Sequence, residues 1–394
     1  GSFLVAKTQD KLSFYCGEDW LQFSIIEYPK LQNYFYSPTG LYMILQARHE
    51  TKDNKNAPTG ATVFNMQLSR PLQRFAVDSP PQMPGPGGKV APNNEINRIE
   101  FGYNDTIIYQ SDKLEVFYPP DFKYETAKRV EQTFDIFSPC KSGPVLFTFR
   151  GQVGAAPPTV KFFNTETMEC INTGPKYNST DAQCVWHPNL PVCAIILTNK
   201  DRKILCFYDL TDPSNVLSYK DDEIKASVVS CAWDPSIKEL KLAAIIESHN
   251  MKQIRTYQLG KNFVSATKFT TAGTQIQFSP SGRFATVDDI QNGSVIVQFY
   301  DMENGLIKSV EMNGVESLQW DPSGVFVLAY SSRSSNSGFS IYLLDGNKVL
   351  IKKIQSFKKC IWRNRLKYQF APNAEDPVPQ ELFESTLAKY GRFG

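Results

Sequence analysis

The residues best suited to acid–base or metal chemistry are few and scattered in this sequence. It contains three histidines, His49, His187 and His249, and a nucleophile–base triad would need one of them as its base. His187 precedes a proline in a recurring turn, which predicts a turn residue, and no G-x-S-x-G nucleophile elbow occurs. The eight cysteines are dispersed without a C-x-x-C pair, which argues against a zinc site. The sequence therefore predicts no enzyme, no metal and no cofactor.

Two other kinds of segment resemble chemical sites only superficially. The acidic pairs at 221–222 and 288–289, together with Asp301, fall at predicted strand ends or loops, where we expect solvated turn carboxylates. The segment Gly85–Lys89 lacks the G-x-x-x-x-G-K-[ST] spacing of a phosphate-binding loop. It lies in the Pro/Gly-rich stretch 79–95, which predicts a mobile surface loop instead.

The amino-acid composition indicates which class of protein this chain belongs to. The 394 residues include 42 Lys and Arg against 40 Asp and Glu, so the net charge of +2 gives no global reason to expect nucleic-acid binding. A 13% aromatic content with 25 prolines and 21% charged residues favours strands over helices. No apolar run approaches the roughly 20 residues of a membrane span. Cysteines inside apolar strands indicate a reduced, cytoplasmic protein.

One recurring pattern organises the chain: a short apolar strand ends in an aromatic residue, and Ser, Asp or His, then Pro and a turn follow. From position 137 onward the copies are 49, 47, 45, 42 and 42 residues apart, close to the roughly 40–45 residues of a four-stranded propeller blade. Proline ends strand pairing because it has no N–H, and we expect the aromatic side chain to pack between neighbouring blades. The aromatic residues stand at positions 36, 101, 137, 186, 233, 278, 320 and 362, and the copies at 101 and 362 are degenerate because they lack the proline.

Both ends of the chain fit a closed ring. The first predicted strands, Phe3–Lys7, Lys11–Cys16 and Leu21–Tyr28, lack an inner strand before them. The last strand, Lys359–Trp362, has no outer strands after it, so pairing the two ends would complete a blade and leave no exposed edge. The sequence therefore predicts an all-β propeller of WD type over residues 1–366, with eight inner strands.

A basic run lies at the end of the predicted propeller. Its seven charged residues are all Lys or Arg. Two interpretations stay open, namely strand charges that simply face solvent, or a basic rim that meets RNA or an acidic protein. The run comprises Lys352, Lys353, Lys358, Lys359, Arg363, Arg365 and Lys367.

Residues 367–394 are predicted as a linker followed by a short helix over Pro379–Gly391. Proline lies near its start and glycine stops it. Phe383, Leu387 and Tyr390 share one face of this helix. A helix of about 11 residues is marginal alone. The apolar face therefore docks either on the propeller or in a groove of a partner protein.

In their order along the chain and in their amino-acid sequence, these elements resemble the b subunit of eukaryotic translation initiation factor 3. Leu12–Trp20 and Tyr36–Tyr42 carry the likeness near the start of the chain. Gln277–Phe284, Leu318–Gly324 and Phe357–Arg365 carry it more specifically near the end. The resemblance covers essentially the whole chain and is loosest in the middle.

The resemblance implies a nine-bladed propeller, so eight or nine blades are expected. It also implies a non-enzymatic scaffold in translation initiation, whose propeller docks on the protein and rRNA of the small (40S) ribosomal subunit. The C-terminal segment would recruit other subunits of the factor, among them a, g and i, without any membrane or small-molecule substrate. The resemblance assigns four tail residues to partner binding: Leu382, Phe383, Leu387 and Tyr390.

Two alternative functions remain open. One is the related propeller of the monomeric initiation factor 2A, whose last blades look similar; the match over Cys16–Pro29 argues against it. The other is a propeller that binds a small ligand at its central channel. Polar residues converging at the channel mouth would favour that ligand site, whereas a plain apolar lining would favour the scaffold.

Overall fold

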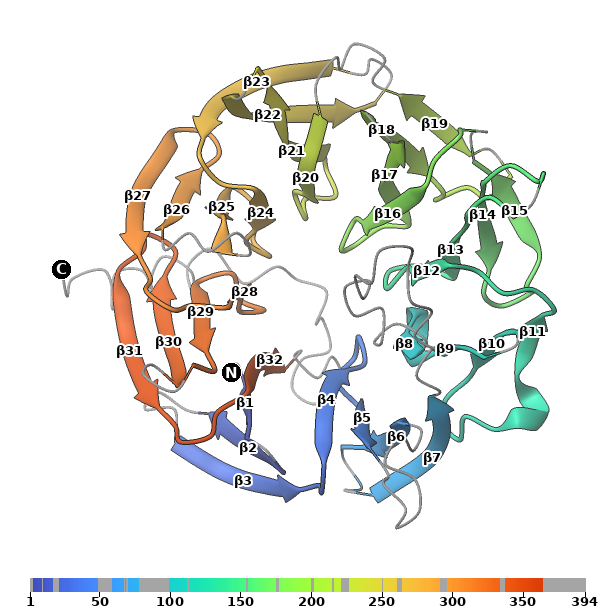
Figure 1. Cartoon of the computed structure of the whole chain (residues 1–394), viewed down its shortest axis with the longest axis horizontal. Helices are drawn as coiled ribbons and strands as arrows, with labels where there is room; N and C mark the ends of the chain where they lie inside the picture. Colours follow the sequence, from blue (N-terminus) through green and yellow to red (C-terminus); the bar gives the residue numbers. More distant parts are fainter. Residues whose placement is uncertain are drawn as a thin grey trace, which may run out of the picture.

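The chain forms a ring of eight four-stranded antiparallel blades in this computed structural model (Figure 1). The count applies to the residues that the structure describes. They are 3–8, 10–16, 21–48, 59–66, 68, 70–77, 99–111, 113–153, 155–174, 177–199, 202–214, 216–220, 227–249, 251–260, 264–290, 296–333 and 337–363. The all-β propeller is thus confirmed with eight blades rather than nine. The predicted loop 79–95 and the predicted tail helix lie outside these ranges.

Seven blades are each built from four consecutive strands, ordered from the central channel outward. Blade 2 contains β4 (Leu31–Tyr36), β5 (Tyr42–Arg48), β6 (Thr59–Asn65) and β7 (Arg70–Val77). Blade 3 contains β8 (Ile99–Phe101), β9 (Ile107–Gln110), β10 (Leu114–Phe117) and β11 (Lys128–Val130), with the short 3-10 turns Tyr103–Asp105 and Tyr124–Thr126. Blade 4 contains β12 (Ile136–Pro139), β13 (Val145–Arg150), β14 (Thr159–Asn164) and β15 (Cys170–Thr173).

Blades 5 to 8 repeat the same order. Blade 5 contains β16 (Asp181–Trp186), β17 (Val192–Asn199), β18 (Arg202–Asp209) and β19 (Leu217–Lys220). Blade 6 contains β20 (Ser227–Trp233), β21 (Leu240–Ser248), β22 (Met251–Leu259) and β23 (Val264–Thr271). Blade 7 contains β24 (Gln275–Phe278), β25 (Phe284–Asp288), β26 (Ile296–Asp301) and β27 (Gly305–Glu311). Blade 8 contains β28 (Ser317–Trp320), β29 (Phe326–Ser331), β30 (Gly338–Leu343) and β31 (Lys348–Lys353).

Blade 1 joins the two ends of the chain, as predicted. Its inner strand is β32 (Lys359–Arg363), and its other strands are β1 (Phe3–Lys7), β2 (Lys11–Cys16) and β3 (Leu21–Glu27). β1 and β32 run antiparallel over five residue pairs, from Phe3 opposite Arg363 to Lys7 opposite Lys359. Figure 1 shows these two strands side by side beside the N-terminus.

In four blades, the predicted aromatic position links the blade to the one before it. Each of the four tryptophans in the described part donates its indole N–H to a backbone carbonyl on the preceding inner strand. A buried indole N–H needs such a partner. The bonds run from Trp186 to Ser138 (3.1 Å), Trp233 to Val185 (2.8 Å), Trp320 to Gln277 (3.3 Å) and Trp362 to Gln319 (3.1 Å).

In blades 5 and 7, the polar residue after the aromatic is a buried turn residue that also reaches the next blade. The Ser279 hydroxyl donates to the Gly324 carbonyl in the equivalent turn of blade 8, at 2.9 Å. His187 is 1% exposed; its Nδ1 accepts from the Asn189 backbone N–H, and its Nε2 donates to the Ser236 carbonyl of blade 6 at 3.3 Å. Burial lowers the pKa of this imidazole. His187 is therefore the turn residue that its repeat position predicts.

The expectation of solvated carboxylates is wrong for two aspartates. Asp288 lies within β25 and is 3% exposed, and burial raises its pKa. Asp301 at the end of β26 is also buried and accepts from the Arg283 guanidinium at 2.8 Å, which lowers the pKa of this carboxyl to about 2. Residues 221–222 lie outside the described ranges. No helix in the described part is long and apolar enough to cross a membrane.

Gly338 is required where β30 pairs with the outer strand of blade 8. Its φ is +144°, and a side-chain carbon there would collide with the Lys352 carbonyl oxygen of β31. We expect Gly338→Ala to lower the free energy of unfolding by about 2 kcal/mol or more, measured by urea denaturation. Gly260→Ala is the matched control, because nothing lies within 4 Å of its added carbon. Equal stabilities for the two variants would contradict this requirement.

Candidate functional site

Four members of the basic run lie along the connection from blade 8 to blade 1. Lys352 and Lys353 end β31, the outer strand of blade 8, and Lys358 lies in the connection. Lys359 begins β32, the inner strand of blade 1. The stretch of chain that carries these four lysines therefore runs from the outer edge of the ring toward its channel, and we call it the basic stripe. Their side chains do not form one row, because the Lys352 ammonium lies over the Tyr15 ring of blade 1, whereas the Lys359 ammonium lies over the Tyr34 ring of blade 2.

The other three members are not part of this stripe. Arg363 ends β32, four residues beyond Lys359, and therefore lies toward the opposite rim. Arg365 and Lys367 lie outside the described residues. The predicted tail residues Leu382, Phe383, Leu387 and Tyr390 also lie outside them, so their role stays a prediction.

The structure adds Lys7, which the linear sequence did not place with the basic run. Lys7 ends β1 directly opposite Lys359 on β32, and the Lys358 backbone N–H donates to the Lys7 carbonyl at 2.9 Å. Residues directly opposite in an antiparallel pair project to the same face of the sheet. We call Lys7, Lys358 and Lys359 the seam lysines, because they lie where the two chain ends meet.

The connection that carries the stripe is fixed at both ends. Ile354 accepts from the Ser337 hydroxyl at 2.8 Å, and its N–H donates to the Ser337 carbonyl at 3.0 Å. Phe357 is fully buried and packs edge-on against the Tyr330 ring, with centroids 5.8 Å apart. The backbone that presents Lys358 is therefore pre-organised.

The seam lysines have no acidic partner within ion-pair distance among the described residues. Burial lowers the pKa of the Lys7 ammonium, and the charges of Lys358 and Lys359 lower it further, while Asp10 opposes them. The Lys359 ammonium donates to the Asn33 amide oxygen at 2.8 Å, and burial lowers its pKa as well. The seam lysines are therefore positively charged groups, and the hydrogen-bond partner of Lys359 is neutral.

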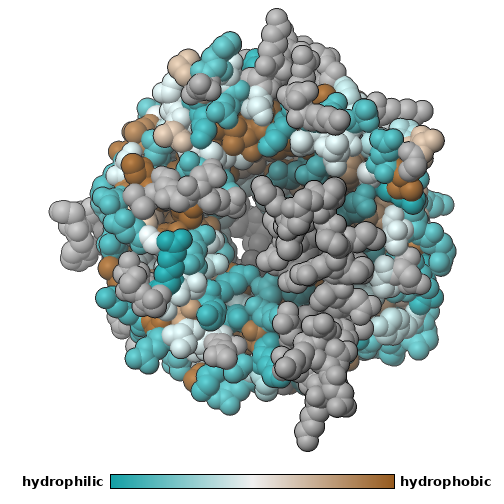
Figure 2. All heavy atoms as spheres, viewed as in Figure 1, coloured by the Kyte–Doolittle hydropathy of each residue, from teal (hydrophilic) through white to brown (hydrophobic). Residues whose placement is uncertain are grey.

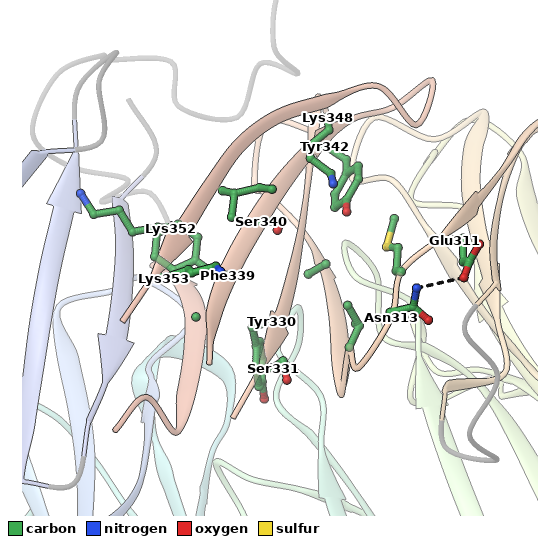
Figure 3. A pocket seen from close by; sticks show the side chains of 15 residues that line it. Glu311, Asn313, Tyr330, Ser331, Phe339, Ser340, Tyr342, Lys348, Lys352 and Lys353 are labelled. Carbon is green, nitrogen blue, oxygen red and sulfur yellow. Dashed lines mark hydrogen bonds between the residues drawn. The ribbon is translucent and has the colours of Figure 1, made fainter. Parts of the chain in front are cut away.

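The outer part of the stripe borders a pocket of about 270 Å³ on blade 8 (Figure 3). Lys352 extends away from this pocket toward blade 1, where its ammonium lies 5.8 Å from the centre of the buried Tyr15 ring. Lys348 stands over the Tyr342 ring at 5.6 Å. A Glu311–Asn313 hydrogen bond of 2.9 Å lies at the side of the pocket opposite Lys352. One cation–aromatic pair, Lys348 with Tyr342, therefore lines this opening.

An opening is visible at the centre of the ring (Figure 2), and the inner strands surround it (Figure 1). β24 and β28 each have one buried and three half-exposed residues. Several half-exposed residues of the inner strands are polar. They include Gln275, Gln277, Gln319 and Asn33, and also Glu100, whose pKa is raised by burial. These residues come from the inner strands of four blades, namely β24, β28, β4 and β8.

The described residues contain no cluster of three or more His, Cys, Asp or Glu side chains that could hold a metal ion. Their cysteines are free thiols, and Cys170 is the exposed one among them. Burial raises the pKa of Cys231 to about 12, so this thiol stays protonated and behaves as a small apolar group. The described part thus forms an eight-bladed propeller whose distinctive chemistry is its basic seam.

Known proteins similar to this chain are translation initiation factors. A Neurospora crassa protein, named as the B subunit of eukaryotic translation initiation factor 3, is 21% identical over 93% of this chain, and its Dictyostelium discoideum counterpart is 22% identical over 97%. A family model described as eukaryotic translation initiation factor eIF2A matches residues 205–360. The predicted resemblance to the b subunit of factor 3 is confirmed, and the factor 2A likeness falls in the later blades, as expected.

The fold agrees with these relatives. A crystal structure of a eukaryotic initiation factor superposes with a TM-score of 0.66 at 13% identity, covering 92% of this chain and 87% of its own. That likeness concerns the fold alone. The chain spans 57% and 58% of the lengths of the Neurospora and Dictyostelium relatives.

At neutral pH, Lys7 should lower the free energy of unfolding of the protein. Replacing it by Met removes a buried charge facing another charge, so we expect a gain on the order of 1 kcal/mol at pH 7. Because the folded-state pKa of Lys7 is lowered, the folded protein releases this proton first as pH rises toward the usual lysine pKa of about 10.4. The gain should therefore shrink between neutral pH and that value.

Denaturant titrations across this pH range measure the effect, with exposed Lys238→Met on blade 6 as the control. A loss of stability in Lys7→Met would show instead that the ammonium has a stabilising partner.

Proposed function

We propose that this chain is the propeller part of a non-enzymatic scaffold in translation initiation factor 3. The similarity to the factor 3 relatives over nearly the whole chain carries the proposal. In it, the propeller docks on the small (40S) ribosomal subunit, and the chain assembles with other subunits of the factor in the cytoplasm.

The physical character of the ring supports a scaffold. Each blade is tied to its neighbours by buried hydrogen bonds and by apolar clusters that lie between the blades, such as the one joining Val5 and Leu12 of blade 1 to Leu31 and Tyr34 of blade 2. A closed ring of this kind presents loops and strand ends at fixed positions, which suits a surface that must bind several partners at once.

Affinity capture of the tagged chain from an extract of its own cells tests the proposal. At low salt we expect other factor 3 subunits and 40S ribosomal proteins to be recovered, because scaffold contacts are local and strengthen as salt falls. A tagged propeller of unrelated function serves as the control bait. Recovery of neither group above that control would overturn the assignment.

The second part of the proposal concerns the tail. We propose that the predicted helix over Pro379–Gly391 binds another member of the complex, the i subunit first, through Leu382, Phe383, Leu387 and Tyr390. The stripe formed by Phe383, Leu387 and Tyr390 has the spacing by which an amphipathic helix lies in an apolar groove.

The double variant Phe383→Ala with Leu387→Ala should abolish capture of the i subunit, because it removes two anchors of the apolar stripe. The propeller should keep its melting temperature. The matched control is Ser385→Ala with Lys389→Ala, which alters the other side of the predicted helix. A melting temperature lowered by several degrees in the first variant alone would show that the tail packs on the propeller instead.

A further inference from the structure

The outer edge of blade 8 is open to a further strand. β31 pairs with β30 on one side, and no strand in the described part pairs with it on the other side. The Ile354 N–H donates to the Ser337 carbonyl at 3.0 Å, so hydrogen-bonded pairs recur at every second residue back along β31. The intervening residues Ile351 and Lys353 therefore direct their backbone N–H and C=O groups outward, away from β30.

β31 also exposes apolar side chains and is strongly basic. Ile351 is 55% exposed and Val349 is 37% exposed. Lys348, Lys352 and Lys353 give this strand three lysines and no acid, more basic residues than any other outer strand in the described part. None of the three makes an ion pair with another described residue. The edge therefore combines outward backbone groups, apolar side chains and positive charge.

The lysines of β31 are divided between the two faces of blade 8. Lys348 and Lys353 line the blade 8 pocket together with Ile351, on the face that adjoins the end of β27 in blade 7 (Figure 3). Lys352 lies on the opposite face, over the Tyr15 ring of blade 1. A strand added beyond β31 would alternate its own side chains between the same two faces, so it would meet lysine on both.

The charge of the edge decides which occupant fits it. Lysines on an edge strand discourage pairing with a second copy of the same edge, because like charges would lie opposite each other. A strand that carries acidic side chains is attracted instead, and its apolar residues can cover Ile351 and Val349. A phosphate backbone would use the charges of the edge but would gain nothing from these exposed apolar side chains.

We propose that the outer edge of blade 8 binds an extended acidic segment of a partner protein as a fifth strand. Main-chain hydrogen bonds to β31 supply affinity, and carboxylates beside Lys348, Lys352 and Lys353 supply selectivity. The proposal goes beyond the proposed function, because it follows from blade 8 alone and holds whichever complex the chain joins.

The experiment measures binding of a short labelled peptide rich in Glu and Val to the purified 394-residue chain, using fluorescence anisotropy at low salt. The control peptide has the same sequence with N-methyl groups along its backbone, which remove N–H donors and keep the charge. We expect the unmodified peptide to bind at least about tenfold more tightly. Equal affinities, or no binding of the unmodified peptide, would overturn the proposal.

Ile351→Pro removes one outward N–H and leaves the hydrogen bonds to β30 intact, since proline is tolerated where the N–H of an edge strand faces solvent. We expect this variant to keep its melting temperature within a few degrees and to lose at least about tenfold in peptide affinity. The matched control is Ile351→Thr, which keeps the N–H and should stay within about threefold of the unchanged chain. Equal peptide affinities of the two variants would overturn strand addition.

A charge swap tests the acidic character of the partner. Lys348→Glu with Lys353→Glu should lose the Glu peptide and bind the same peptide with Lys in place of Glu more tightly, a gain that misfolding does not produce. The control variant reverses the exposed Lys123 of blade 3 and Lys238 of blade 6 in the same way. Equal changes in the two variants would mean that net charge alone attracts the peptide, which overturns the site.

Other occupants of the edge would show in the same series of variants. A short labelled RNA that depends on Lys348 and Lys353, in place of the peptide, would overturn the acidic strand in favour of RNA. Dimers of the unchanged chain in analytical ultracentrifugation, abolished by Ile351→Pro, would overturn it in favour of a second copy. Because the peptide assay needs no other protein of the complex, its failure leaves the capture experiment standing, and failed capture alongside peptide binding overturns only the proposed function.

Discussion

The pairing of β1 with β32 is the constraint on which the rest of the ring depends. Five residue pairs join strands from opposite ends of the chain, and no other strand in the described part completes blade 1. Without this pairing, β32 and β1 would each present an unpaired edge beside the channel. The next blade secures it, because the fully buried Tyr34 of β4 donates its hydroxyl to the Val5 carbonyl at 2.6 Å. Closure thus fixes the position of every blade relative to its neighbours.

The tryptophan bonds extend the same constraint around much of the ring. Each indole reaches the inner strand of the preceding blade, so the tilt between two blades is set by a directed bond as well as by apolar contact. Where Phe278 replaces tryptophan in blade 7, the buried Ser279 hydroxyl still links that blade to the next. Two residues of one short motif therefore bond in opposite directions, one backward and one forward. This explains why the motif recurs at blade spacing while the outer strands vary.

The inner strands of the blades could be predicted from the repeated sequence pattern. Contacts between the two ends of the chain could not. The eight inner strands could be found because each ends in an aromatic residue, which six of them follow with a proline turn, and both features have local causes. Lys7 and Lys359 are far apart in the chain, and neither shows its role alone. Predicting that their strands pair was correct, but the register that sets them opposite each other came only with the structure. Asp301 was misjudged for a similar reason, since its partner Arg283 lies in the turn directly before β25, the neighbouring strand of the same blade.

The location of the seam lysines bears directly on the closure of the ring. Lys7 belongs to the first strand of the chain and Lys359 to the last, so their mutual repulsion opposes the very pairing that closes the ring. The ring closes nevertheless, because five backbone pairs join β1 to β32 and apolar side chains pack on both sides of blade 1. The cluster toward blade 8 includes Leu4 and Cys360, and the cluster toward blade 2 includes Val5 and Leu12. Burial of apolar surface on both faces therefore outweighs the repulsion between two lysines at the end of the strand pair.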